Sequence, residues 1–433
     1  MDVEPIKALG KDGNAVSTQH EKEIKYLLEG VNIDDEGFEF QDVGDSEWQD
    51  FEFYGFDDSS NEDYKQPNQF SSDSETPSFV LEDLEVSSDE NIFLNRNQPL
   101  SSTTTKPTQR VIATEMDEIV HKNLKVNGIN MHVAEIGKGP DCVLFLHGFP
   151  ELWYSWRHQM LHLSAHGYRA IAPDLRGYGD TDVPPSATSY TVFHVVGDLV
   201  ALLDELGLEK VFLVGHDWGA MIAWTFCLIR PDKIKALVNT SIVFQPRNPA
   251  VQPIQGYRAL LGDGFYMCRF QEPGKAEAAF ASAGAQAVIS TFLSVRDVKP
   301  PCIPVQIDLG ALFKSPVALP SWLTEEDVNY YASKFDKTGF TGGLNYYRAM
   351  DLSWELSAAW TGSQIKVPVK FLIGDLDLTY HFPGVKDYID NGGFKKYVPL
   401  LEQVVVMEGV AHFLNQERPE EVSEHIYDFI KKF

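Results

Sequence analysis

The segment around Asp217 constrains the fold of this 433-residue chain more than any other. Residues 211–214 are apolar and predict a short buried strand, and residues 220–224 predict the start of a helix. Between them stands Gly215-His216-Asp217-Trp218-Gly219. A strand that turns directly into a helix between two glycines holds its central residue above the edge of a sheet. We therefore expect a sheet whose strands alternate with helices, with Asp217 at its carboxyl edge.

Strands and helices are predicted to alternate through most of residues 121–433. Residues 122–135 predict two strands around the hairpin turn Asn127-Gly128. Further strands are predicted at residues 142–146, 169–172, 211–214, 236–239, 367–373 and 404–407. Amphipathic helices lie between them, as over residues 193–206, where apolar side chains recur with helical spacing. This pattern predicts an α/β fold with a mostly parallel central sheet covered on both faces.

The alternation stops between residues 244 and 362. This stretch contains helix formers, aromatic residues and prolines, without the apolar runs of buried strands. We expect a mainly helical lid over the carboxyl ends of the strands, where open α/β sheets bind ligands. The expected domains are an extension over 1–113, the first part of the core over 114–243, the lid over 244–362, and the second part of the core over 363–433.

The N-terminal extension differs in composition from the rest of the chain. Residues 1–110 contain 26 acidic and 8 basic residues, so this quarter holds most of the net charge of −27. Its serine- and threonine-rich stretches, 71–75 and 101–105, contain too few apolar side chains to offset the entropy cost of ordering, so we expect disorder. Acidic and aromatic residues alternate at 36–40 and 51–56, a pattern typical of segments that bind a protein partner. A solvated tail without a partner and a wrongly joined upstream exon remain alternatives.

Composition also excludes several classes of protein. The acidic balance disfavours a nucleic-acid partner. The sequence contains no run of about 18 apolar residues, so it predicts no membrane span. The acidic start Met1-Asp2-Val3-Glu4 differs from a secretory signal, and the final three residues do not form a peroxisomal signal. The cysteines form no C-x-x-C pair, as is typical of a reducing compartment, so we expect a cytoplasmic protein.

An aspartate at the turn implies a particular chemistry. Serine is usual at this position and attacks a carbonyl, whereas an aspartate attacks a saturated carbon and forms an alkyl ester. Asp217 therefore favours cleavage of epoxides or alkyl halides. Hydrolysis of the ester needs a base and an acid that orients it. His412 follows the strand predicted at 404–407, and Asp375 and Asp377 follow the strand predicted at 367–373, in the chain order of nucleophile, acid and histidine.

Two backbone amides are candidates for an oxyanion hole, which stabilises the negative oxygen of an intermediate. One belongs to Trp218, which follows the nucleophile. The other belongs to Phe149, in a loop directly after the strand predicted at 142–146. The bond between Phe149 and Pro150 is a candidate cis peptide.

Two further residues stand close to these motifs. Glu151 is a candidate member of a water network near the site, or an acid stabilised by a helix N-terminus. His216 is a candidate hydrogen-bonding group beside the nucleophile, or a packed residue of the turn.

Taken together, these motifs resemble the soluble epoxide hydrolases of the α/β-hydrolase superfamily, most closely the plant type. The matching segments are His147-Gly148-Phe149-Pro150-Glu151, Asp174-Leu175-Arg176-Gly177-Tyr178-Gly179, Gly215-His216-Asp217-Trp218-Gly219, Asn345-Tyr346-Tyr347-Arg348 and His412-Phe413. The resemblance covers residues of about 120–433 and implies the α/β-hydrolase fold. It implies Asp217 as the nucleophile, His412 as the base and Asp377 as the orienting acid.

The resemblance also implies two tyrosines in the lid, at Tyr266 and Tyr347. The residues themselves leave the choice between Tyr346 and Tyr347 open, and we favour the one adjoining Arg348. Opening an epoxide develops an alkoxide, which two phenols can hydrogen-bond and protonate. The implied reaction converts fatty-acid or other lipophilic epoxides and water to vicinal diols. We expect no cofactor and no metal, because no histidine or cysteine cluster has metal-ligand spacing.

Two other functions remain open. Haloalkane dehalogenases also carry an aspartate at the turn, but they must stabilise a halide, commonly with Asn at the position that Phe149 occupies. A non-catalytic ligand receptor with an interaction tail is the second alternative. The full set of nucleophile, base, acid and tyrosines favours epoxide hydrolysis over both.

Overall fold

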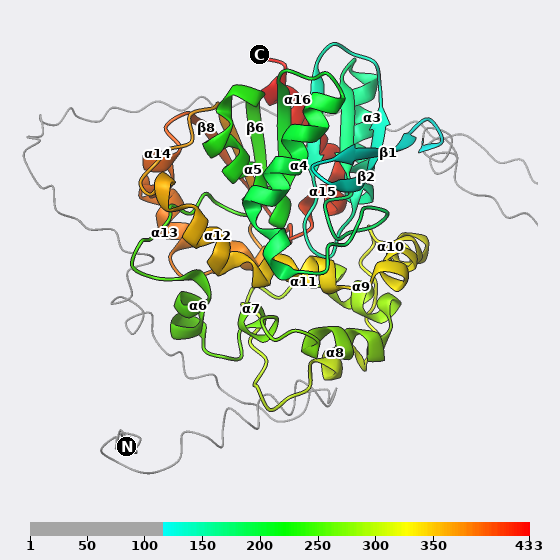
Figure 1. The fold of residues 1–433 in the computed structure, drawn as a ribbon, viewed down its shortest axis with the longest axis vertical. Coiled ribbons are helices and arrows are strands. Elements are labelled where there is room, and N and C mark those ends of the chain that lie inside the picture. The colour runs from blue at the N-terminus through cyan, green and yellow to red at the C-terminus, as the bar shows by residue number, and fades with distance from the viewer. Residues whose placement is uncertain (1–115) are drawn as a thin grey trace, which may run out of the picture.

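An eight-stranded sheet forms the centre of the computed structural model, which describes residues 116–433 (Figure 1). The strand order is β1-β2-β4-β3-β5-β6-β7-β8. The strands are β1 (Val120–Val126), β2 (Ile129–Ile136), β3 (Cys142–Leu146), β4 (Arg169–Pro173), β5 (Val211–His216), β6 (Ile234–Thr240), β7 (Val369–Gly374) and β8 (Leu401–Met407). β2 is antiparallel to both β1 and β4, and the other pairs are parallel. The prediction of a mostly parallel sheet is confirmed.

The predicted strands are present, with small differences at their ends. β1 and β2 join at Asn127 and Gly128, whose φ angles of 46° and 83° are those of a tight hairpin turn. β7 begins at Val369 rather than at residue 367, because Pro368 has no N–H to donate to a neighbouring strand. β8 begins at Leu401, before the predicted residue 404. Its first half contains exposed polar residues, since it lies at the edge of the sheet.

Helices cover both faces of the sheet because the side chains of each strand alternate between two cores. Leu144 and Leu146 of β3 pack in one core with α4 (Val192–Glu205) and α5 (Trp218–Ile229). Val143 and Phe145 pack in the other core with α3 (Arg157–Ala165) and α16 (Pro419–Ile430). The central strands are buried on both faces and are therefore continuously apolar, which is the signal that made them predictable.

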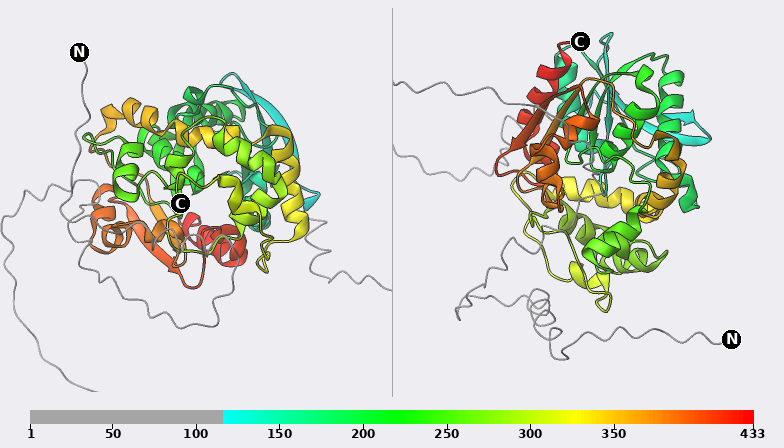
Figure 2. Two further views of the ribbon diagram at one scale, coloured as in Figure 1. Left: turned by 90° about the horizontal axis from the view of Figure 1, so that it is seen from below. Right: turned by 90° about the vertical axis from the view of Figure 1, so that its left-hand side faces the viewer.

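The segment between β6 and β7 is mainly helical, as predicted. Its helices are α6 (Pro253–Leu261), α7 (Tyr266–Arg269), α8 (Lys275–Ala283), α9 (Ala285–Leu293), α10 (Glu325–Thr338), α11 (Thr341–Arg348) and α12 (Met350–Leu356). Figures 1 and 2 show these helices gathered on one side of the core, opposite the C-terminus. We call residues 244–362 the lid. Shorter helices complete the core at α13 (Val385–Asp390), α14 (Gly393–Tyr397) and α15 (Leu414–Glu417).

Polar contacts hold the lid on the core. The Tyr346 hydroxyl, on α11, donates a hydrogen bond of 2.9 Å to the backbone carbonyl of Arg176. Asp327, on α10, accepts a 3.0 Å bond from the guanidinium of Arg157 and a 2.9 Å bond from the hydroxyl of Tyr154. These groups are largely buried, so the lid packs as a fixed part of the molecule.

The acidic extension predicted over residues 1–113 lies outside the described residues. Within residues 116–433, no helix is both long and apolar enough to cross a membrane.

A buried ion pair supports the loop that carries the Arg176 carbonyl. Arg176 Nε donates to Asp198 Oδ2 at 2.6 Å, and the two side chains are only 4% and 0% exposed. Asn127 Nδ2 donates to the same carboxylate at 2.8 Å. This pair joins α4 to the loop after β4, against which α11 of the lid packs.

We predict that Asp198→Asn lowers the free energy of unfolding by about 3–5 kcal/mol, because it leaves the Arg176 charge buried without a counter-ion. Urea unfolding of the two proteins measures this difference. Asp232→Asn is the matched control, since Asp232 and Arg230 form an ion pair that is mostly exposed. Its effect should stay below about 1 kcal/mol. Equal losses in the two variants would contradict the role of burial.

Candidate active site

Asp217 occupies a strained turn between β5 and α5. Its φ of 51° and ψ of −121° are unusual for a residue other than glycine, and such a conformation costs about 1–3 kcal/mol. Close packing of the neighbouring backbone holds the turn in place. A Cβ atom on Gly219 would lie 2.1 Å from the Leu146 carbonyl oxygen, and a Cβ atom on Gly148 would lie 2.3 Å from Asp217 Oδ1. Both positions therefore require glycine.

The loop after β3 places an amide against the carboxylate. Phe149 N–H donates to Asp217 Oδ1 at 2.7 Å, and the bond from Phe149 to Pro150 is cis. Trp218 is the first residue of α5, and its N–H makes no hydrogen bond with the described residues, as is usual at a helix N-terminus. The two amides predicted as oxyanion donors thus come from the expected places, one already bonded to Asp217 and the other unpaired.

His412 lies between two carboxylates. Its Nδ1 is 2.9 Å from Asp377 Oδ1, and its Nε2 is 3.6 Å from Asp217 Oδ2. Asp377 follows β7 and His412 follows β8, so the parallel strands bring both to the edge of the sheet where β5 presents Asp217. Asp377 is fully buried. Asp375 does not contact His412, and instead its Oδ1 accepts a 3.3 Å bond from the amide of Val410.

Charge rather than burial determines the protonation of this histidine. Burial alone would lower the pKa of His412, but the negative charge of Asp377 and the interaction with Asp217 outweigh it and hold the pKa well above the usual 6.5. Burial would raise the pKa of Asp377, but the charge and hydrogen bond of His412 bring it below its usual value. The two carboxylates therefore favour the imidazolium form of His412.

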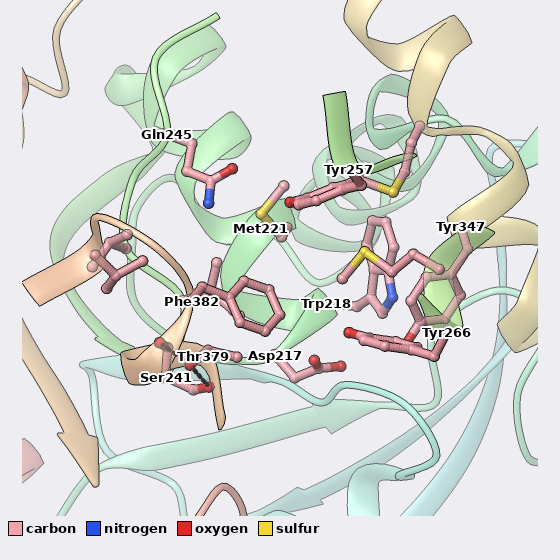
Figure 3. A pocket seen from close by; sticks show the side chains of 15 residues that line it. Asp217, Trp218, Met221, Ser241, Gln245, Tyr257, Tyr266, Tyr347, Thr379 and Phe382 are labelled. Carbon is pink, nitrogen blue, oxygen red and sulfur yellow. Dashed lines mark hydrogen bonds between the residues drawn. The ribbon is translucent and has the colours of Figure 1, made fainter. Parts of the chain in front are cut away.

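Tyr266 and Tyr347 reach the site from the lid. Tyr266 begins α7, and Tyr347 lies on α11, with 6.0 Å between their ring centroids. Figure 3 shows both side chains on the Asp217 side of the same cavity. Burial raises the pKa of each phenol well above 10, and nearby Asp217 adds to this effect, so both hydroxyls keep their protons. Tyr346 faces away and bonds to the core.

A small cavity lies beside Asp217 and the two lid tyrosines. Its lining is mostly apolar and contains no lysine or arginine. The lining residues are Asp217, Trp218, Met221, Ser241, Ile242, Val243, Gln245, Tyr257, Tyr266, Met267, Tyr347, Met350, Thr379, Phe382 and Val385.

Glu151 and His216 form a buried pair behind the site. His216 Nδ1 is 2.8 Å from Glu151 Oε2, and His216 Nε2 is 2.8 Å from the backbone carbonyl of His412. Gln416 donates to the other carboxylate oxygen of Glu151 at 3.0 Å. Burial would raise the pKa of Glu151, but the charge of His216 outweighs it and lowers the pKa to about 2. The pair therefore connects the turn at Asp217 to the loop that carries His412.

Sequence reasoning missed two hydroxyls at the site. Ser241 Oγ lies 3.1 Å from His412 Nδ1, and the Thr379 hydroxyl and amide both lie 3.0 Å from Asp377 Oδ1. Ser241 follows β6 at the same edge of the sheet, and this placement was the available signal. Its left-handed backbone, with φ of 71°, could not be inferred from the sequence.

One cluster outside the site has metal-binding geometry within the described residues. His132, Asp174 and Asp180 lie close together, but His132 Nδ1 already pairs with Asp174 at 2.8 Å. Asp180 forms ion pairs with Lys334 and Lys337 of α10. The two lysine charges disfavour a bound cation, and we assign this cluster to the attachment of the lid.

Comparisons with known proteins agree with this geometry. A family described as "alpha/beta hydrolase fold" matches residues 141–269. The chain is 67% identical to "Epoxide hydrolase 3" of Siraitia grosvenorii over 318 residues, which are 73% of this chain and all of that protein. It is 35% identical to "Epoxide hydrolase A" of Mycobacterium tuberculosis, over 75% of this chain and 97% of that one. The chain belongs to the epoxide hydrolase family.

Solved structures of the family have the same fold. The crystal structure of an epoxide hydrolase from Vigna radiata has a TM-score of 0.72 and 62% identity, covering 73% of this chain and 99% of that one. The structure of a potato (Solanum tuberosum) epoxide hydrolase has a TM-score of 0.70 and 58% identity, covering 73% and 100%. The predicted family, fold and enzyme class are confirmed.

The raised pKa of His412 predicts how stability changes with pH. A raised pKa contributes stability that is complete below the unfolded value of 6.5 and is lost as pH rises through the folded value. His412→Gln lacks this contribution. We expect the difference in unfolding free energy between the wild type and His412→Gln to be largest near about pH 6 and to shrink toward about pH 10. Urea unfolding at each pH measures it, and a difference that grows with pH would contradict the assignment.

Proposed function

We propose that this chain hydrolyses lipophilic epoxides to vicinal diols through a covalent alkyl ester on Asp217. One observation carries the proposal: two protonated phenols, Tyr266 and Tyr347, line the same cavity as a carboxylate at a strained turn. A nucleophilic carboxylate and acidic hydroxyls are the two components that epoxide opening needs. Water is the second substrate.

In the first step, Asp217 Oδ2 attacks an epoxide carbon. The carbon–oxygen bond of the ring breaks, and its electron pair moves to the departing oxygen. Tyr266 and Tyr347 donate hydrogen bonds to that oxygen, and one of them supplies the proton. Phe149 N–H holds Oδ1 meanwhile, so Oδ2 is the oxygen free to react.

In the second step, His412 takes a proton from water, and the hydroxide attacks the carboxyl carbon of Asp217. Esterification removes the negative charge of Asp217, which is one of the causes that raise the pKa of His412. Its pKa therefore falls once the ester exists, so the imidazolium passes its proton through solvent to the tyrosinate left by the first step, and the neutral imidazole then acts as the base. The amides of Phe149 and Trp218 stabilise the oxyanion, and its collapse releases the diol. Asp377 orients His412, while Glu151 and His216 position the loops around them.

A single turnover in oxygen-18 water tests the ester. We expect label in the Asp217 carboxylate, because hydroxide attacks the enzyme ester rather than the substrate. Peptide mass spectrometry locates it. Label found only in the diol would indicate direct hydrolysis.

His412→Gln should slow ester hydrolysis by about 10²–10⁴-fold, so the alkyl-enzyme accumulates, whereas Asp217→Ala should form none. Release of halide from haloalkanes without diol formation from epoxides would favour dehalogenation instead.

We further propose that the enzyme works in a reducing compartment such as the cytoplasm. All four cysteines are free, and three of them are buried, which agrees with cysteines that pack as apolar side chains. The proposed domain boundaries remain those expected from the sequence, with the lid over 244–362 between core segments 114–243 and 363–433. A protein partner for the acidic extension, residues 1–113, also remains a proposal.

Removal of the extension tests its role in catalysis. The similarity to the Siraitia grosvenorii relative covers all of that protein but only 73% of this chain. The residues proposed for the chemistry all lie in the matched part. We therefore expect the fragment 114–433 to hydrolyse epoxides with a kcat/KM within about twofold of the value for the full chain. Steady-state kinetics of both proteins measures this. An inactive but folded fragment would assign the extension a part in catalysis.

A further inference from the structure

One wall of the cavity is a loop with a firmly held backbone. This loop covers residues 242–248, directly after β6, and so lies between the core and the lid. Three of its carbonyls accept hydrogen bonds from aromatic side chains: Ile242 from Trp224 Nε1 at 2.8 Å, Phe244 from the Tyr388 hydroxyl at 2.9 Å, and Asn248 from Trp354 Nε1 at 2.7 Å. Arg247 also donates to the Trp354 carbonyl at 2.8 Å. These bonds fix the backbone on both sides of Gln245.

Gln245 is the polar side chain that this loop turns into the cavity. Figure 3 shows Gln245 at the end of the cavity remote from Asp217, with its amide turned toward the interior. The side chain is half-buried and forms no hydrogen bond with the residues that the structure describes. An amide offers two N–H donors and an acceptor oxygen. A partly buried amide without a protein partner, on an anchored backbone, is suited to bind a ligand.

Two hydroxyls of the lining, those of Ser241 and Thr379, are engaged with the buried polar residues of the site. Ser241 bonds to His412, and Thr379 bonds to Asp377 and to the Ser241 carbonyl. Because the lining has no lysine or arginine, a ligand carboxylate would be buried without a counter-ion and near the charge of Asp217. The chemistry at Gln245 therefore favours a neutral group that both donates and accepts a hydrogen bond, and a hydroxyl is the smallest such group.

We infer that Gln245 binds a hydroxyl group on the substrate, remote from the epoxide, so that the preferred substrates are lipophilic epoxides carrying such a hydroxyl. The epoxide lies between Asp217 and the two phenols, and the hydrocarbon chain crosses the apolar lining at Met221. A few well-placed polar groups in an apolar pocket fix the orientation of a ligand in this way. This inference rests on the proposed epoxide hydrolysis and names the substrate class of that site.

The test compares pairs of terminal epoxides of increasing chain length, in which the far end carries either a hydroxyl or a methyl group. For the full-length wild type, we expect one chain length at which kcat/KM for the hydroxyl substrate exceeds that for its methyl partner by about three- to tenfold, the effect of one hydrogen bond. Gln245→Leu removes the amide at similar size, and this ratio should fall to about one.

Two further variants separate recognition from structure. Gln245→Asn keeps the amide on a side chain one methylene shorter, so the preferred chain length should increase by about one carbon, which a purely structural role would not produce. Gln252→Leu is the matched control, because Gln252 is exposed, lies outside the cavity lining and makes no side-chain cap bond to α6. It should keep the wild-type ratio.

The outcomes distinguish the inference from the proposed function. A wild type that hydrolyses epoxides but has a ratio near one at every chain length overturns the inference alone. A ratio that survives in folded Gln245→Leu overturns it as well. If no epoxide of either kind yields a diol, the proposed function fails, and the inference fails with it.

Discussion

The site depends on the close approach of α5 to the end of β3. Gly219 lies so near the Leu146 carbonyl that no side chain fits between them, and this contact forces the chain through the strained conformation of Asp217. The same approach brings the loop after β3 under the carboxylate, where Phe149 donates its amide. Backbone packing therefore places the carboxylate of Asp217, the proposed nucleophile, against the Phe149 amide. Because the packing belongs to the core, it offsets the local cost of the strained turn.

The charges around His412 determine the order of the two proposed reaction steps. Two carboxylates raise the pKa of His412 in the resting state, and one of them is the proposed nucleophile. The proposed reaction at Asp217 thus changes the basicity of His412, which acts in the next step. Fixed positions are essential to this coupling, since an interaction between charges weakens with distance. The buried pair of Glu151 and His216 contributes by joining the turn, the loop after β3 and the loop of His412.

Much of this arrangement could be predicted from the sequence, because its signals are local. The buried strands β3 and β5 are apolar throughout, and Asp217, Asp377 and His412 each follow a strand. Contacts between residues far apart in the sequence leave no local pattern from which they could be predicted. The bond from Ser241 to His412 joins residues 171 positions apart, and it depends on a left-handed backbone at Ser241. The edge strand β8 was predicted too short, because solvent exposure lets polar residues interrupt its apolar pattern.

The adjacent tyrosines of α11, Tyr346 and Tyr347, point in different directions and have different roles. Tyr346 anchors the helix to the core through the Arg176 carbonyl, while its neighbour Tyr347 faces the cavity. Tyr347, one of the two proposed proton donors, is therefore placed against the core by its neighbour, while Arg348 on the same helix pairs with Glu277 of α8. Sequence changes in α6, which contributes Tyr257 to the lining, can reshape the cavity while Tyr347 keeps its position relative to Asp217. In such a scaffold, selection can diversify the accepted substrates without disturbing the reaction.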